Sequence, residues 1–265
     1  MIIAGSVVCC FFNSSIVTRN KQFKTYLCAV IVVENLCKSY GTQKAIDSIS
    51  FSASAGRVTG FLGPNGAGKS TTMKILSGFL APDGGTVEIA DVNILEQALE
   101  AKRLLGYLPE NNPLYLDLYV KESLAVLADI HQLKNKKSRI AEVIEMTGLG
   151  PQQHQKAGAL SKGFRQRLGL AQAILHDPSV LILDEPTSGL DPNQVLDIRN
   201  LIKELGKTKT VLLSTHILQE VEVICEQVMI LSRGELIADH PKQTLLDLHP
   251  GKSLEQIFAQ LTCNY

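Results

Sequence analysis

The stretch from Gly63 to Ser70 constrains the fold of this chain more than any other segment. Its letters, GPNGAGKS, match the pattern G-x-x-x-x-G-K-[ST]. A β-rich run at 57–62 precedes it, and apolar residues at helical spacing follow it until Gly78. A strand, a glycine loop and a helix in this order predict a phosphate-binding loop, because glycines let successive backbone N–H groups turn toward the phosphates. The alternative is an ordinary glycine-rich turn between a strand and a helix.

The same pattern assigns a task to each position of the loop. The lysine reaches the β- and γ-phosphate oxygens, and the following serine holds Mg²⁺. A guanine site would need an N-K-x-D element, which Asn135-Lys136-Lys137-Ser138 does not provide, so ATP is favoured over GTP. The predicted ATP contacts are Tyr40, Gly63, Pro64, Asn65, Gly66, Ala67, Gly68, Lys69, Ser70 and Thr71. Tyr40 is a candidate aromatic face for adenine, with a core or surface tyrosine as the alternative.

Two further runs, SVLILDE at 179–185 and KTVLLSTH at 209–216, have the apolar character expected of strands buried on both faces of a parallel sheet. The first run ends in two acids. Asp184 is placed to hold the Mg²⁺ shell and Glu185 to polarise an attacking water. Acids at a strand end also arise from helix capping or plain solvation, and the surrounding DEPTSGLDP favours the catalytic interpretation.

Helical spacing dominates the middle of the chain. Between 119 and 156 apolar residues repeat with a helical period and no strand signal, which predicts a helical insertion in an α/β core. Asp191 and Pro192 predict the start of a helix that ends just before Gly206. A hairpin turn is expected at 233–234. The final apolar pattern predicts an amphipathic helix with these residues facing inward: Leu254, Ile257, Phe258 and Leu261.

Composition narrows the possible functions. The 265 residues include 26 basic and 26 acidic ones, so no global field favours nucleic acid or anionic lipid. No apolar run approaches the roughly 18 residues of a membrane helix. Six cysteines without a CxxC pair predict reduced thiols in a cytosolic protein. Residues 1–29 lack a signal-peptide pattern, and we expect a disordered extension or wrongly included upstream codons, with an extra edge strand as the alternative.

The segment 157–174, GALSKGFRQRLGLAQAIL, predicts a loop that breaks into a helix at Ser161. Lys162, Arg165 and Arg167 stand in the first turns, where free backbone N–H groups and the helix dipole already repel cations. This crowding of positive charge predicts that an anion docks there.

In their order along the chain, these motifs resemble an ABC-type ATPase over about residues 31–261. The resemblance rests on Tyr40, the loop 63–71, LSKGF at 160–164, LILDE at 181–185, SGLD at 188–191 and STH ending in His216. It implies an α/β fold with a RecA-like P-loop NTPase core, an N-terminal antiparallel β subdomain and an inserted α-helical subdomain at about 111–167. It also implies an ATPase domain at 30–241 and a C-terminal helical tail at 242–265.

The resemblance implies roles for particular residues as well. Ser161 and Gly163 match the signature motif, which contacts the γ-phosphate of an ATP held by the loop of a partner subunit. Two copies would then close on two ATP molecules, and hydrolysis would reopen the dimer. Glu185 is the implied general base, His216 the γ-phosphate switch residue, and Asp191 part of the dimer-facing loop.

Two positions depart from the usual family pattern. The signature reads L-S-K-G-F where L-S-G-G-Q is common, so Lys162 and Phe164 replace a glycine and a glutamine. Lys162 either adds a cation near the phosphate or points into solvent, and we favour solvent. Glu110 stands where the family usually has a glutamine that touches Mg²⁺ and the lytic water. Its carboxylate still suits Mg²⁺, but it adds negative charge beside Asp184 and Glu185 and is expected to slow turnover.

The combination of YLPE and LSKGFRQR looks like the exporter-type branch, and YLPENNPLYLDLYV is similar to gliding-motility-associated subunits. This implies an ATP-hydrolysing homodimer, peripheral on the cytoplasmic face of the cell membrane, that docks on a separate transmembrane permease through the helical insertion and the Glu110 loop. The alternative is a soluble ABC ATPase that acts on ribosomes, DNA or cluster assembly. The neutral charge argues against nucleic acid as a partner.

Overall fold

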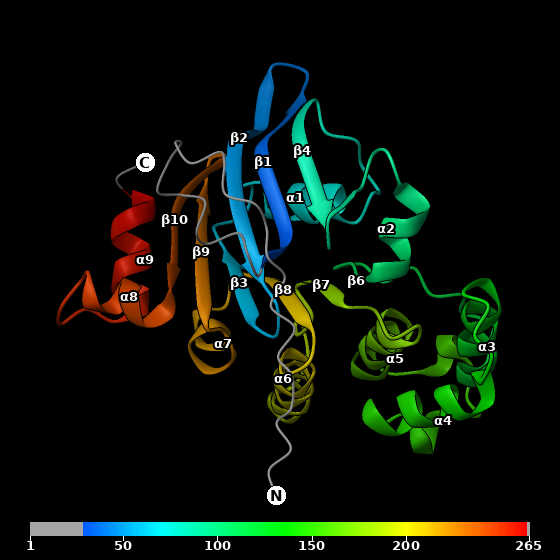
Figure 1. The fold of residues 1–265 in the computed structure, drawn as a ribbon. Coiled ribbons are helices and arrows are strands. Elements are labelled where there is room, and N and C mark those ends of the chain that lie inside the picture. The colour runs from blue at the N-terminus through cyan, green and yellow to red at the C-terminus, as the bar shows by residue number, and fades with distance from the viewer. Residues whose placement is uncertain (1–28, 264–265) are drawn as a thin grey trace, which may run out of the picture.

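The structure is a computed structural model that describes residues 29–263 (Figure 1). Our prediction of a disordered extension falls on residues 1–28, outside the described residues, except for Ala29, which begins the first strand. Among the described cysteines, Cys37, Cys225 and Cys263 are free. Within the same residues, no helix combines the length and the apolar character that crossing a bilayer requires.

Two β-sheets form the framework of the molecule. The smaller sheet is antiparallel, with the strand order β2-β1-β4-β5. Its strands are β1 (Ala29–Tyr40), β2 (Gln43–Ser54), β4 (Gly84–Ile89) and β5 (Val92–Asn93). The larger sheet has the order β10-β9-β3-β8-β7-β6 and is parallel except for the edge strand β10. Its strands are β3 (Val58–Leu62), β6 (Leu105–Leu108), β7 (Val180–Asp184), β8 (Thr210–Thr215), β9 (Gln227–Ser232) and β10 (Glu235–Pro241).

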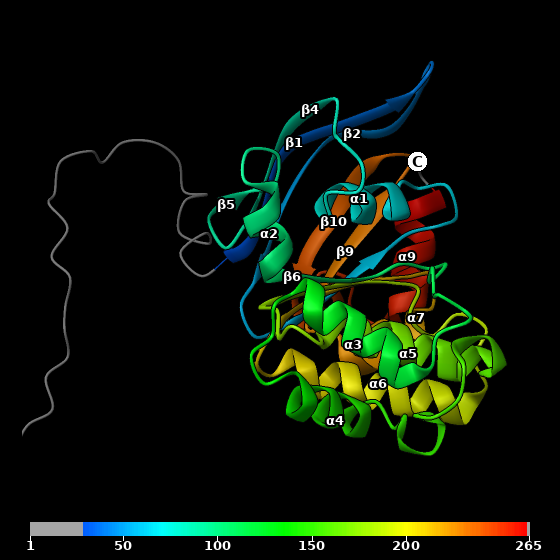
Figure 2. The same ribbon diagram turned by 90° about the vertical axis from the view of Figure 1, so that its right-hand side faces the viewer.

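Helix α1 (Lys69–Leu76) lies between the two sheets (Figures 1 and 2). Its Met73 and Leu76 are fully buried in one apolar cluster with Ile31 of β1 and with Phe61 and Ile182 of the larger sheet. Burial on both sides explains why the central strands are largely apolar, since every residue of β7 and β8 is buried.

The opposite face of the larger sheet carries a second apolar cluster and most of the remaining helices. These helices are α3 (Val120–Ile130), α4 (Lys136–Met146), α5 (Lys162–Ile174), α6 (Pro192–Gly206) and α7 (Leu218–Ile224). Figure 1 shows α3, α4 and α5 grouped beyond the β6 edge of the sheet. The predicted helical insertion is confirmed as helical, and the predicted fold class is confirmed by the combination of both sheets with these helices.

Local predictions also match the structure. Asp191 caps α6 by accepting a hydrogen bond from the Gln194 N–H at 3.0 Å. Arg233 and Gly234, with φ of 48° and 85°, make the predicted hairpin turn between β9 and β10. Three further helices complete the described chain: α2 (Ala98–Leu104), α8 (Lys242–Asp247) and α9 (Leu254–Cys263). The last of these is the predicted C-terminal amphipathic helix.

Candidate active site

The glycine loop connects β3 to α1, where the sequence predicts it. At two positions of the loop only glycine fits, because the backbone of another segment lies too close for a Cβ atom. A Cβ atom on Gly63 would lie 2.4 Å from the carbonyl oxygen of Leu231, and one on Gly68 would lie 2.4 Å from that of Ala45. Gly68 also has a φ of 107°, which only glycine adopts without strain. The loop is therefore held tightly between strands of both sheets.

Lys69 is buried at the start of α1, and its ammonium points back into the loop. Its Nζ donates hydrogen bonds to the carbonyl oxygens of Gly63 at 2.7 Å and Pro64 at 3.1 Å. Burial lowers the pKa of Lys69, while the charges of Glu185 and Asp184 oppose that change. The lysine is thus positioned by the loop it is predicted to serve.

Adjacent parallel strands bring the predicted catalytic acids to the same edge of the larger sheet. Asp184 ends β7 and is buried, and the Ser70 hydroxyl donates a hydrogen bond to its Oδ1 at 3.4 Å. Glu185 follows with a left-handed φ of 51°. Its Oε1 and Oε2 lie 2.8 and 2.9 Å from Nδ1 of His216, which follows β8. Burial raises the pKa values of both acids, and the hydrogen bond from His216 partly offsets the rise for Glu185.

Lys69, Ser70, Glu185 and His216 line a cleft of about 520 Å³, within the range of ligand sites. Asp184 is not part of this lining and contacts it through the hydroxyl of Ser70. Glu110 reaches the cleft from the segment after β6, and Tyr40 reaches it from the end of β1. Gln43 and Ala45 of β2 line the cleft as well, although no motif in the sequence pointed to them. The complete lining is Tyr40, Gln43, Ala45, Asn65, Gly66, Gly68, Lys69, Ser70, Thr71, Glu110, Glu185 and His216.

The oxygen atoms around the cleft suit a hard divalent cation. The Ser70 hydroxyl and the carboxylates of Asp184 and Glu110 are ligand types that Mg²⁺ prefers. Within residues 29–263, no group of three His, Cys, Asp or Glu side chains is placed to hold a metal alone. Mg²⁺ commonly takes one or two protein carboxylates and completes its shell with substrate phosphates and water.

The predicted signature residues lie outside this cleft. Ser161 is exposed and caps α5, accepting a hydrogen bond from the Phe164 N–H at 3.4 Å. Gly163 packs against α6, since a Cβ there would lie 2.2 Å from Oε1 of Gln194. Neither Ser161, Gly163 nor Asp191 lines the cleft.

The sequence matches the family model described as ABC transporter over residues 46–188. The chain belongs to the ABC transporter family. It is an ATP-binding ABC ATPase whose ATP hydrolysis is coupled to transport, as predicted.

Curated relatives and solved structures agree with this assignment. The Bacitracin transport ATP-binding protein BcrA of Bacillus licheniformis is 40% identical over 214 residues, 80% of this chain and 70% of the relative. The Nod factor export ATP-binding protein I of Burkholderia orbicola (strain AU 1054) is 35% identical over 234 residues, 87% of this chain and 77% of the relative. A solved ATP binding subunit of an ABC transporter is 28% identical and superposes with a TM-score of 0.81, over 88% of this chain and 99% of that one.

Arg165 and Arg167, two of the cations near the predicted anion site at the start of α5, both make contacts within the chain. The docking of an anion at this helix start stays a prediction. Arg165 Nη2 donates to the carbonyl oxygen of Gly158 at 2.8 Å. Arg167 Nη1 donates to the carbonyl oxygen of Thr147 at 2.9 Å, and its Nη2 pairs with Asp197 at 2.7 Å. Charge spacing along the sequence cannot reveal such distant partners.

Lys162 and Phe164, the two departures in the ABC signature, take different positions. Lys162 is exposed, as favoured, and its ammonium lies against Gly189, where an added Cβ would be 2.0 Å from Nζ. Phe164 is partly buried, with the Arg167 guanidinium 5.9 Å from its ring centroid.

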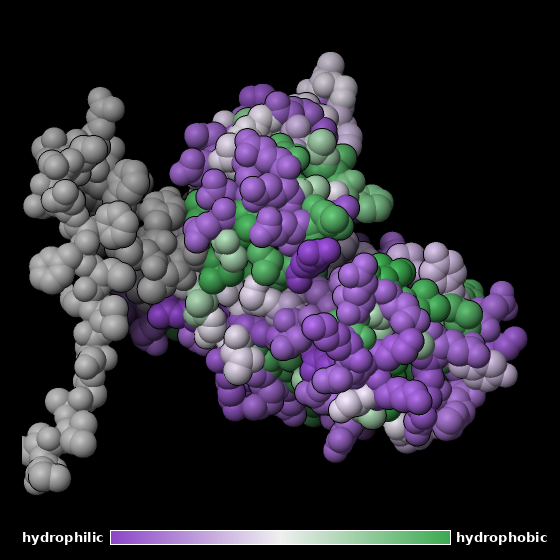
Figure 3. Space-filling model, turned by 45° about the vertical axis from the view of Figure 1, so that its right-hand side comes forward, coloured by the Kyte–Doolittle hydropathy of each residue, from purple (hydrophilic) through white to green (hydrophobic). Residues whose placement is uncertain are grey.

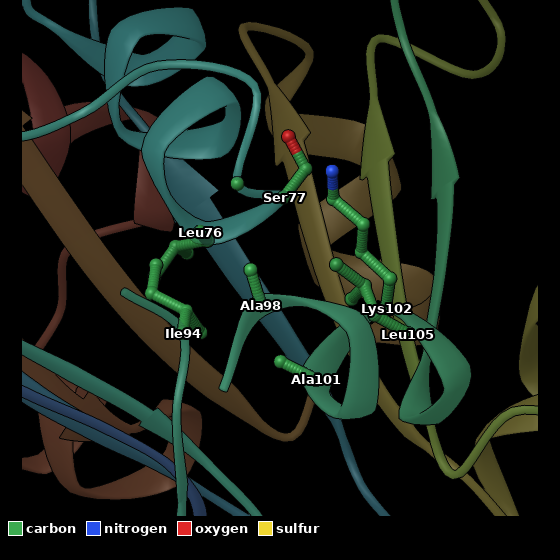
Figure 4. A pocket seen from close by; sticks show the side chains of 8 residues that line it. Leu76, Ser77, Ile94, Ala98, Ala101, Lys102 and Leu105 are labelled. Atoms are coloured by element: carbon green, nitrogen blue, oxygen red, sulfur yellow. The ribbon is translucent and has the colours of Figure 1, made fainter. Parts of the chain in front are cut away.

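A second, much smaller hollow of about 10 Å³ lies between the end of α1 and α2 (Figure 4). Its lining is mainly apolar, with Leu76, Ile94 and Leu105 among the contributing side chains, and it shares no residue with the main cleft. It is too small for a nucleotide, so the large cleft is the candidate active site of this ABC ATPase.

Proposed function

We propose that this chain is the ATP-hydrolysing subunit of an ABC exporter, driven by closure of a homodimer on ATP. The observation that supports it most is the division of the motifs. The cleft unites the loop lysine and the Glu185–His216 pair, while the signature serine stands outside on an exposed helix tip. A site divided in this way is completed only by a second copy.

Each residue of the cleft has a proposed task toward ATP and Mg²⁺. Tyr40, with 52% of its surface exposed at the cleft, stacks on adenine. Lys69 and the backbone N–H groups of the loop bind the phosphates. Ser70, Asp184 and Glu110 hold Mg²⁺, which supplies charge neutralisation on the phosphate oxygens when bound.

Glu185 is the proposed general base for the attacking water. Burial raises the pKa of this carboxyl toward the range where a base is effective, and contact with Nδ1 of His216 at 2.8 Å fixes its direction. His216 is half exposed in the cleft, where it is placed to sense the γ-phosphate. Ser161 and Gly163 contact that phosphate from the second copy, and Asp191 takes part in the loop that faces the dimer.

The export direction is carried over from the relatives, one of which is named for Nod factor export. Within the exporter-type branch, we propose that the chain is related to gliding-motility-associated subunits, because the motif YLPENNPLYLDLYV is similar to theirs. We infer a peripheral position on the cytoplasmic face of the membrane, because transport requires a membrane partner that the described residues do not supply.

A surface near Glu110 is suited to a permease. Apolar side chains are exposed on α2 and on the segment that leads to α3, with Leu99 at 71% and Tyr115 at 74% exposure. Figure 3 shows apolar patches interrupting the polar surface on the side of the molecule that carries these elements. Exposed apolar residues in such numbers are typical of a protein interface.

Co-purification tests the proposal. A tagged chain expressed in its native cells should recover a membrane-embedded partner in detergent, and Tyr115→Asp should reduce that recovery. Leu248→Asp changes a side chain of similar exposure in the turn after α8 and should leave recovery unchanged. Nuclease-sensitive association with ribosomes, and no membrane partner, would instead support the soluble alternative.

A further inference from the structure

Glu220 is a buried acid that the proposed reaction does not use. It lies in α7, one helical turn beyond His216, and its relative exposure is 0%. Burying a carboxylate costs free energy unless hydrogen bonds and opposite charge compensate. The partners that compensate this one therefore show what the carboxylate holds.

Three side chains from three segments meet at the Glu220 carboxylate. Thr187 donates its hydroxyl hydrogen to Oε1, and the Thr215 hydroxyl donates to Oε2 at 2.8 Å. Arg199 Nη2 lies 3.7 Å from Oε1. The Thr215 hydroxyl also accepts a hydrogen bond from the Ile217 N–H at 3.0 Å. One carboxylate thus links the loop after β7, the end of β8, and α6.

Each linked segment carries a residue of the proposed site. Thr187 follows Glu185 by two positions, and Thr215 immediately precedes His216. Helix α6, which carries the arginine, begins directly after Asp191. The Glu185–His216 contact joins the first two segments at the cleft, and the buried carboxylate joins them a second time behind it.

The backbone at Glu185 needs support of this kind. Its φ of 51° lies in the left-handed region, which costs a residue with a side chain free energy and persists only where the surroundings hold it. The Glu185 N–H donates to the carbonyl oxygen of Ser214 at 3.0 Å, and its carbonyl accepts from the Ser188 N–H at 3.1 Å. The hydrogen bond from the Thr187 hydroxyl to Glu220 holds the same turn through a side chain.

We propose that Glu220 is a positioning residue, which holds Glu185 and His216 at their working distance through the hydroxyls of Thr187 and Thr215. This rests on the proposed roles of Glu185 and His216. An apolar side chain would fill the space without a buried charge, so the carboxylate contributes directed contacts rather than volume.

Removing single hydroxyl groups tests the link with little change in volume. Thr187→Val and Thr215→Val should each lower kcat for ATP about tenfold, because the base loses alignment, while the KM and Kd for ATP stay within about twofold. Thr187→Ser and Thr215→Ser keep the hydroxyl and should restore kcat. Thr210→Val is the matched control, a buried threonine at the opposite end of β8, and should leave kcat unchanged.

Glu220→Gln should lower kcat to the level of the Thr187→Val/Thr215→Val double variant, and combining all three changes should add little, because they remove one network. If Glu220→Gln does not fold, the threonine variants decide. Threonine variants with the kcat of Thr210→Val, or serine variants that fail to recover, would overturn the positioning role. The Glu185→Gln variant distinguishes a failure of the positioning role from a failure of the proposed function. If it is inactive while the threonine variants are normal, only the positioning role fails, whereas an active Glu185→Gln contradicts the proposed function itself.

Discussion

The phosphate cleft and the tip of α5 differ in how many hydrogen bonds their functional side chains make within the chain. In the cleft, Lys69 bonds to its own loop, Ser70 to Asp184, and His216 to Glu185. At the tip, Ser161 makes one long cap hydrogen bond and remains exposed. The first region is assembled before any ligand arrives.

Under the proposed function, this difference separates ATP binding from turnover. A preorganised cleft can bind ATP in a single copy, because its donors are already fixed. The helix tip offers the N–H groups of its first turn and the positive end of a dipole, to which the phosphate held by a second copy would bind. Hydrolysis would then depend on association of two copies. The predictions below change one region at a time.

The largest effect is expected from Glu185→Gln. Loss of the general base should lower turnover about a thousandfold, while ATP binding is retained because the loop is untouched. ATP should then hold the dimer closed, which size-exclusion chromatography with Mg²⁺ and ATP would detect. A variant that stays monomeric under saturating ATP would contradict the division between the two regions, and near-parental hydrolysis would move the base assignment elsewhere, first to Glu110.

Ser161→Arg changes the tip of α5 and leaves the phosphate cleft intact. Its bulk and charge block the helix tip, so turnover should fall about a hundredfold, comparable with the loss of a donor to a developing anion. The Kd of ATP, measured by fluorescence of a labelled nucleotide, should match that of the parent protein. Weaker ATP binding in this variant would mean that the tip contributes to the cleft of its own chain.

The cleft was more predictable from the sequence than the tip, for a physical reason. Its loop is contiguous, and its acids follow a strand whose burial on both faces leaves a continuous apolar run. Two lining residues on β2 were missed because an antiparallel strand from elsewhere supplies them. Strand β6, only 4 residues long, was missed because it is too short to show a period.

Around the tip, the sequence could not show the contacts that two arginines make. The partners of Arg165 and Arg167 are backbone carbonyls and an acid from other segments. Glu220 shows the same limit, because an acid in a helix gives no sign that it is buried among two threonines and an arginine. Contacts between distant segments follow from the fold and leave no local pattern.

A smaller effect is expected from Glu110→Gln. Burial raises the pKa of Asp184, and the charge of Glu110 adds to that rise. Removing this charge lowers the pKa of Asp184, so this proposed Mg²⁺ ligand stays ionised to lower pH. Turnover should rise about twofold to fivefold, and the acid limb of the kcat–pH profile should shift to lower pH. Glu88→Gln, an exposed acid on β4, serves as the control. An unmoved acid limb would show that Glu110 does not act on the metal site.

Arg167→Met gives the smallest effect and tests whether this arginine serves the stability of its own chain. The side chain links α5 to the end of α4 and to α6 through Thr147 and Asp197. Its loss should lower the free energy of unfolding by about 1–3 kcal/mol, since a largely buried carbonyl contact is broken. Lys207→Met removes an exposed ion pair and should cost less than about 1 kcal/mol. Urea unfolding of each variant and of the parent protein would measure both changes in the free energy of unfolding. If Arg167→Met instead kept full stability and lost ATP-dependent dimerisation, the arginine would belong to the anion-binding tip after all, and the boundary between the two regions would have to include it.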